Sequence, residues 1–103
     1  MLNNAVIVGR IVSAPKVNET ENGKKESLIT LAVPSTFKND EGEYETNFIP
    51  CLLQGGIAEN TANYCRSGDL VGIKGRLSRT ETEQPMTLVA EKVTFLASKK
   101  TEE

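Results

Sequence analysis

Five separate stretches of the chain are rich in hydrophobic residues arranged with the period of two that is typical of β-strands. The predicted strands cover residues 5–12, 27–33, 44–54, 70–77 and 86–96. Turn residues separate them: Asn22-Gly23 follows the first strand, and Gly42 lies in a charged loop after the second. We expect the second strand to pair with the first as a hairpin. Because Pro50 cannot donate a hydrogen bond within a sheet, we expect an edge position or a bulge there.

The first strand is hydrophobic on both of its faces. One face carries Val6, Val8 and Val12, and the other carries Ala5, Ile7 and Ile11. A strand of this kind must be covered on both sides. In a small barrel one face fills the interior, and a partner subunit is the simplest cover for the other. The first strand therefore predicts an oligomer.

One stretch, residues 57–65, has a convincing helical period, with a narrow apolar stripe formed by Ile57, Ala58, Thr61, Ala62 and Cys65. Gly68 follows where a glycine C-terminal cap belongs. The order of three strands, one helix and two strands is the pattern of the OB-fold, a five-stranded, partly open Greek-key barrel. We predict an all-β OB-fold domain over residues 1–97 and a short charged tail over residues 98–103.

Strand alternation also predicts which side chains fill the barrel. The expected inner residues are Ile49, Cys51 and Leu53 on the third strand, Val71, Ile73 and Leu77 on the fourth, and Val89, Val93 and Phe95 on the fifth. We expect Tyr64, on the helix, to lie in the core as well. Gly9, Gly72 and Gly75 fall inside strands, where glycine marks a bulge or a sharp bend of a barrel.

Composition narrows the functional classes. The length of 103 residues suits one domain, and the chain has no apolar run near the ~18–20 residues of a membrane span and no signal-like start, so we expect a cytoplasmic protein. The two cysteines, Cys51 and Cys65, lie among apolar residues and are expected to be buried reduced thiols. Histidine is absent and two cysteines alone cannot supply four zinc ligands, so the composition argues against a zinc site and against most hydrolase constellations; we predict no enzyme, no metal and no cofactor. The net charge of −2 argues against a strongly basic nucleic-acid binder, although local patches decide binding.

Several segments, in the same order along nearly the whole chain, resemble the bacterial single-stranded DNA-binding protein family. They are residues 2–11, 31–37 and 47–51, Ala58-Glu59-Asn60 with Tyr64, Gly68, and Gly75-Arg76-Leu77. The resemblance implies binding of single-stranded DNA without sequence preference, wrapped around a homotetramer. It also implies protection of exposed strands during DNA replication, recombination and repair.

The resemblance suggests which residues bind DNA. Phe37 and Phe48 stand where the family places aromatic residues that stack on bases, and Tyr44 is a further candidate for stacking or for an edge position. The candidate phosphate contacts are Arg10, Lys38, Lys74, Arg76 and Arg79. We expect these residues to cluster on the first and fourth strands and the adjoining loops, with Arg10, Arg76 and Arg79 as the main contacts. The alternative for Phe48 is packing under a loop or in a subunit interface.

The chain departs from the family in three places. Gln54 replaces an aromatic residue, the loop over residues 78–85 is short, acidic and without an aromatic, and the chain ends at Glu103 without the family's acidic tip. We therefore expect weaker binding or fewer nucleotides per site, and tail-mediated partners are not predicted. Such a chain is either a short family member or one whose tail was removed. The alternatives are a dimeric primosomal replication protein acting mainly through protein contacts, or an OB module that binds structured RNA or only protein.

Overall fold

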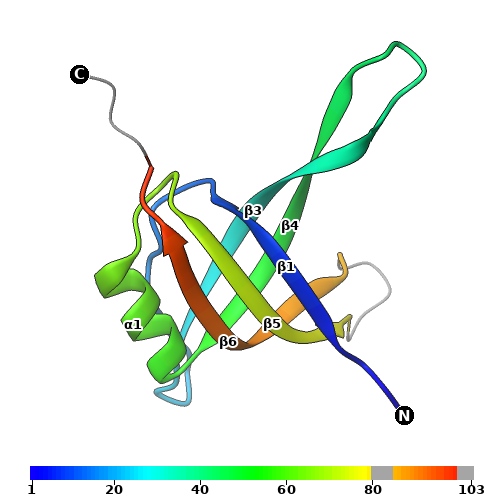
Figure 1. Ribbon diagram of the computed structural model, residues 1–103. Helices are drawn as coiled ribbons and strands as arrows, with labels where there is room; N and C mark the ends of the chain where they lie inside the picture. The colour runs from blue at the N-terminus through cyan, green and yellow to red at the C-terminus, as the bar shows by residue number, and fades with distance from the viewer. Residues whose placement is uncertain (80–84, 100–103) are drawn as a thin grey trace.

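The computed structural model describes residues 1–79 and 85–99, and in these ranges the chain forms six strands and one helix (Figure 1). The elements are β1 (Ala5–Ile11), β2 (Asn18–Glu19), β3 (Lys25–Lys38), β4 (Tyr44–Gln54), α1 (Gly56–Tyr64), β5 (Leu70–Ser78) and β6 (Thr87–Ala97). β2 has two residues, so the five long strands and the helix follow in the predicted order.

The five long strands close into a barrel. Their order in the sheet is β1-β5-β6-β4-β3, and β1 also pairs with β3, which joins the two ends. The predicted hairpin between the first two long strands is only partly correct, because β1 pairs with β3 at two positions, Arg10 with Ala32 and Ile11 with Leu31. Most of β1 pairs with β5 instead. The connection over residues 12–24 is too long for a tight turn, and it contains β2, which pairs with the start of β3.

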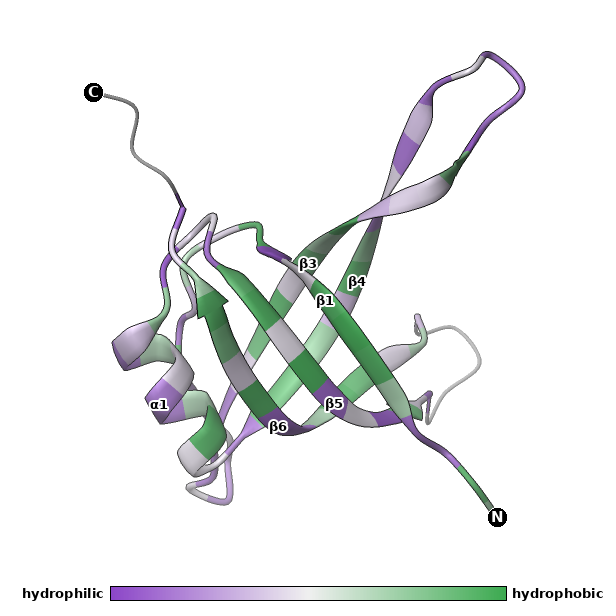
Figure 2. Cartoon of the chain, viewed as in Figure 1, coloured by the Kyte–Doolittle hydropathy of each residue, from purple (hydrophilic) through white to green (hydrophobic). Residues whose placement is uncertain are grey.

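The barrel interior is filled by alternating strand residues, as the sequence pattern predicts. The largest fully buried side chains include Ile11, Leu31, Leu53, Val71, Ile73 and Leu88. α1 lies against β3, β4 and β6 and buries Ala58 and Thr61. Figure 2 shows hydrophobic and hydrophilic residues alternating along β5, as expected for strands with one face toward the core. At Pro50, the pairing of β3 with β4 is regular, and the pairing of β4 with β6 begins only at Cys51, so Pro50 occupies an edge position rather than a bulge.

The predicted alignment of Val89 with Val93 and Phe95 is wrong because β6 contains a bulge. Lys74 pairs with Lys92 but Gly75 pairs with Ala90, so Glu91 is the extra residue. One extra residue reverses which side chains face inward. Leu88 and Ala90 therefore face inward before the bulge, whereas Val89 faces the other way, although it is also buried at 7% exposed. Gly75 lies opposite this bulge, and a Cβ atom there would stand 2.0 Å from the Val89 carbonyl oxygen, which explains why glycine is needed.

Tyr64 and Phe95 were expected in the core, but both are exposed, Tyr64 by 78% and Phe95 by 49%. Tyr64 lies about 90° around the helix from the centre of its buried stripe, at 100° per residue. Phe95 pairs with Val71 near the end of the barrel, two residues before β6 ends. Leu77, at the other end of β5, is also partly exposed rather than buried. Phe95 and Leu77 lie on the inner faces of their strands but beyond the side chains that would cover them at each end of the barrel, and both are therefore partly exposed.

Candidate nucleic-acid interface

The outer face of β3 and β4 presents a strip of apolar side chains. The register places three cross-strand pairs on this face: Leu28 with Leu52, Thr30 with Pro50, and Ala32 with Phe48. These residues face outward because the residues between them, including Ile29, Leu31, Cys51 and Leu53, are buried. Phe48 is 63% exposed and Leu28 is 65% exposed. The packing alternative for Phe48 therefore receives no support from contacts within the chain.

Beyond the barrel, β3 and β4 continue as a long two-stranded arm (Figure 1). Lys38 pairs with Tyr44 in this arm, and its Nζ atom lies 5.6 Å from the centre of the Tyr44 ring, within cation–π range. Phe37 is exposed, and its amide nitrogen donates to the Ser35 hydroxyl at 3.1 Å within an irregular part of β3. The arm therefore carries two exposed rings, Phe37 and Tyr44.

Arg10 stands on the same row of residues as Phe48. Arg10 of β1 pairs with Ala32 of β3, and Ala32 pairs with Phe48 of β4. Neighbouring strands are ~4.8 Å apart, so about 10 Å separates Arg10 from Phe48 along this row. The Arg10 side chain donates from Nη1 to the Gly68 carbonyl oxygen at 2.9 Å. This bond holds the guanidinium against the loop before β5, on the side of β1 away from β3, and leaves its other N–H groups able to bind an anion.

The other basic candidates lie elsewhere, so the expected cluster of Arg10, Arg76 and Arg79 is wrong. Arg10 pairs with Leu70 at one end of the ladder between β1 and β5, and Gly75 is at the other end, five residues or ~17 Å away. Lys74 and Arg76 belong to that far end. Arg79 follows Ser78, whose partner Thr87 begins β6, and the next residue of β6, Leu88, pairs with β4. The winding of the strands thus separates Arg10 from the three basic residues of the β5 end.

Ion pairs engage two of the basic residues. The Lys25 ammonium contacts the Glu59 carboxylate, and this hydrogen bond, together with the charge of Glu59, raises the pKa of Lys25. Nη1 of Arg76 lies 3.8 Å from a carboxylate oxygen of Glu91. Both pairs are about half exposed, so solvent screens them and they contribute little to stability. A phosphate near Arg76 must compete with Glu91, which makes Arg76 a weaker candidate than Arg10.

Other sequence expectations fall outside this face. The short acidic loop lies largely at residues 80–84, and the end of the tail at residues 100–103; both segments are outside the described residues. Gln54, the replacement for an aromatic, is exposed at the end of β4 and pairs with Glu26.

The sequence did not predict a hollow that Tyr64 and Phe95 line together. The feature that could have indicated it is the position of Tyr64 at the edge of the apolar helical stripe, two residues before Arg66.

Within the part of the chain that the structure describes, no three His, Cys, Asp or Glu side chains come together as a metal site. α1 has nine residues, and no helix in the same ranges is long and apolar enough to span a membrane.

The chain matches the profile of the Single-strand binding protein family over residues 2–100. It is 39% identical to Single-stranded DNA-binding protein 3 of Listeria innocua, with 96% of this chain and 66% of that protein aligned. It is 40% identical to Single-stranded DNA-binding protein A of Bacillus subtilis, with 96% of this chain and 62% of that protein aligned. The chain thus spans slightly less than two thirds of the length of these relatives.

Among solved structures, the SSB domain of a Synechococcus protein superposes with a TM-score of 0.74, over 91% of this chain and 96% of that chain. The sequence identity is 17%, so the likeness concerns the fold alone, and it confirms the predicted OB-fold barrel.

Proposed function

Because this chain belongs to the single-strand binding protein family, we propose that it binds single-stranded DNA without reading its sequence. A family of binding proteins agrees with the prediction that the chain is not an enzyme. We take residues 1–97 as the binding domain and residues 98–103 as a tail. The processes that this activity serves are DNA replication, recombination and repair, in which single strands are exposed.

The observation that carries the proposal is the exposed ring of Phe48 in one row with Arg10. A ring on an outer strand face stacks on any base, since every base has a π-face, and a nearby guanidinium binds the adjoining phosphate. Phe37 and Tyr44 extend the stacking surface along the arm, and Lys38 adds a cation there. None of these contacts reads a base edge, so the binding tolerates any sequence. Arg79 and Lys74 would contact phosphates at the far end of β5, with a smaller contribution from Arg76.

The direct test is a titration of fluorescein-labelled oligo(dT) followed by fluorescence anisotropy at several salt concentrations. We expect the logarithm of the binding constant to fall linearly with the logarithm of salt, by about 0.7 for each phosphate neutralised. Unlabelled single-stranded DNA should compete, while double-stranded DNA should compete poorly. No binding of oligo(dT) at low salt would refute the proposal. Preferential competition by structured RNA would favour an RNA-binding OB module instead.

We also propose that the chain assembles through the outer face of β1. Val6 and Val8 are exposed there, although both are hydrophobic. Val8 and Leu96 flank Gly72, since a Cβ atom at Gly72 would contact both, at 3.7 and 3.8 Å. These side chains form a continuous apolar patch across β1, β5 and β6, and such patches mark interfaces.

Light scattering tests the assembly. We expect a tetramer, and a Val8→Lys variant should fall to a smaller species because it places a charge in the patch. Asn63→Lys, which adds the same charge on the exposed side of α1, is the matched control. A dimer of the unmodified chain would favour the alternative of a primosomal replication protein that acts mainly through protein contacts.

Cys51 and Cys65 are buried free thiols, which supports a reducing compartment such as the cytoplasm.

A further inference from the structure

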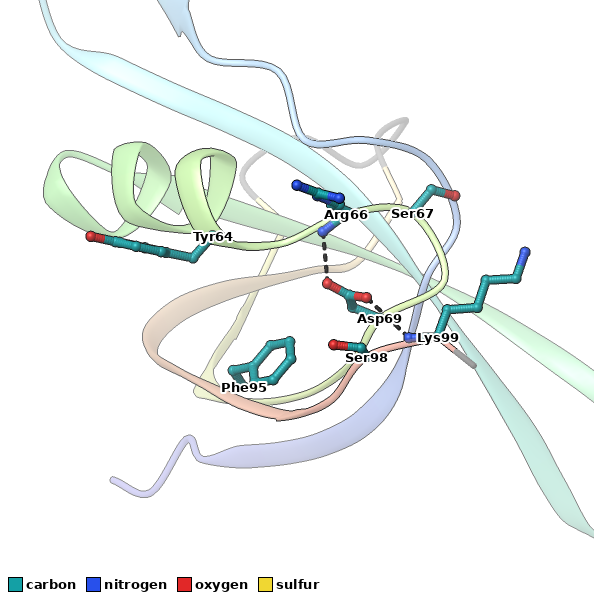
Figure 3. Close-up of a pocket in the computed structure, with 7 residues that line it drawn as sticks. All are labelled: Tyr64, Arg66, Ser67, Asp69, Phe95, Ser98 and Lys99. Carbon is teal, nitrogen blue, oxygen red and sulfur yellow. Dashed lines mark hydrogen bonds between the residues drawn. The ribbon is translucent and has the colours of Figure 1, made fainter. Parts of the chain in front are cut away.

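A hollow of about 560 Å³ lies between the end of α1, the loop before β5 and the end of β6 (Figure 3). Tyr64 and Phe95 lie on one side of it, Lys99 on the other, and Asp69 between them, with Arg66 near the end of the helix. We propose that this hollow is a second nucleotide subsite. A base stacks on Tyr64 and Phe95, and its phosphate binds Arg66 and Lys99. The inference rests on the proposed single-stranded DNA binding and extends its path around the barrel.

The two rings supply the stacking surface. Their exposure, 78% for Tyr64 and 49% for Phe95, is not explained by packing within the chain. Both rings also border a second hollow of about 300 Å³, which continues toward Ile57 and Val93. The rings thus line both hollows. The flat π-face of a base stacks on exposed aromatic rings of this kind.

The charges in the first hollow favour an anion. The Asp69 side chain is 5% exposed and accepts hydrogen bonds from the backbone amides of Arg66, at 2.8 Å, and Lys99, at 3.2 Å. Its carboxylate is therefore occupied in holding the loop and the end of β6 together. The side chains of Arg66 and Lys99 are exposed, and neither takes part in an ion pair found within the described residues. Two exposed cations beside two rings are complementary to a nucleotide.

The loop that borders the hollow is bonded to β1, the strand that carries Arg10. Gly68, in the loop that borders the hollow, donates its N–H to the Ile11 carbonyl at 2.7 Å and accepts from Arg10 at 2.9 Å. The stem of Lys99 covers Gly68 on the other side, since a Cβ atom at Gly68 would lie 2.5 Å from the Lys99 Cδ atom. Arg10 and Lys99 therefore both contact Gly68, and these two cations lie between Phe48 and the rings of the hollow. A strand that leaves Phe48 past Arg10 meets Lys99 next, and then the two rings.

Tyrosine fluorescence tests the subsite directly, because the chain has no tryptophan and only two tyrosines, Tyr44 and Tyr64. A Tyr44→Phe variant keeps the ring at position 44 and leaves Tyr64 as the sole emitter. We titrate it with oligo(dT) of increasing length while following binding by the anisotropy of a labelled oligo(dT). Stacking should quench Tyr64 with long oligomers, and less with oligomers short enough to be held by the Phe48 face alone.

Two variants give independent readouts. Tyr64→Ala should weaken binding of long oligo(dT) by about 5- to 150-fold, the effect of losing one stacked base, and leave short oligomers unaffected. Arg66→Ala should reduce the salt slope by about 0.7. Asn63→Ala, an exposed change on α1 away from both hollows, is the matched control, and thermal melting verifies that each variant is folded.

The outcomes separate the subsite from the proposed function. If the anisotropy rises while Tyr64 emission and the affinity of Tyr64→Ala stay unchanged, the subsite is refuted and single-stranded DNA binding stands. If the anisotropy stays flat for every oligomer, both proposals fail. If a peptide rich in Asp and Phe changes Tyr64 emission and oligo(dT) does not, the hollow binds a protein segment, and the inference is overturned.

Discussion

Replacement of Phe48 by alanine removes the central ring of the candidate interface. Phe48 is 63% exposed, so only about a third of its side chain contributes to the folded barrel. Full burial of such a side chain contributes ~1.5–3 kcal/mol, and we therefore expect a loss of unfolding free energy of about 1 kcal/mol or less. A stacked base contributes ~1–3 kcal/mol to binding. The expected weakening of oligo(dT) binding is about 5- to 150-fold, since 1.4 kcal/mol corresponds to a factor of ten.

The assay is the anisotropy titration with labelled oligo(dT), performed at one salt concentration for all variants. Leu28→Ala is the matched control, because Leu28 is 65% exposed and lies on the same outer face, two cross-strand pairs away. Phe48→Leu keeps apolar bulk without a ring and separates stacking from hydrophobic contact. Light scattering must show the same oligomer for each variant. If Phe48→Ala binds within a factor of two of the unmodified chain, or if Leu28→Ala weakens binding equally, stacking on Phe48 is refuted.

Three further predictions concern the barrel itself. Gly75→Ala should lower the free energy of unfolding by about 3 kcal/mol or more in urea titrations, because its Cβ would overlap the Val89 carbonyl. Gly72→Ala is the control, because the nearest atom to its Cβ would lie at 3.7 Å. An equal loss in both variants would contradict the overlap as the cause. Ser27→Ala should be neutral or stabilise the fold by up to ~1 kcal/mol in the same titration, because the Ser27 hydroxyl is fully buried without a hydrogen-bond partner among the described residues; a loss above that amount would count against it. Burial raises the pKa of Cys51 to about 11 from an ordinary value of 9.0. The free energy of unfolding should therefore be constant below pH 9 and fall as the pH rises toward 11, because the thiol ionises first in the unfolded chain. Thermal melting between pH 9 and 11 should show a smaller fall in melting temperature for Cys51→Ala than for the unmodified chain. An equal fall in both proteins would exclude the thiol as the cause.

Short-range pattern in the sequence was sufficient for much of the fold and part of the site. Alternation along β4 places Ile49, Cys51 and Leu53 on one face, and this leaves Phe48 on the other. The same reasoning identified the two hydrophobic faces of β1. These conclusions need only the geometry of a single strand, in which neighbouring side chains point in opposite directions.

The tertiary structure decided which residues meet. Arg10 and Arg76 lie on paired strands, yet the antiparallel register places them at opposite ends of the ladder. The bulge at Glu91 reversed the inner face of β6, and the limit of the core exposed Tyr64 and Phe95 beside Arg66 and Lys99. The sequence by itself determined the faces of β1 and β4 and the buried stripe of α1, because these depend on residues a few positions apart. Only the fold decided the register, the bulge and the hollow, because these depend on backbone contacts between segments that are far apart in the chain.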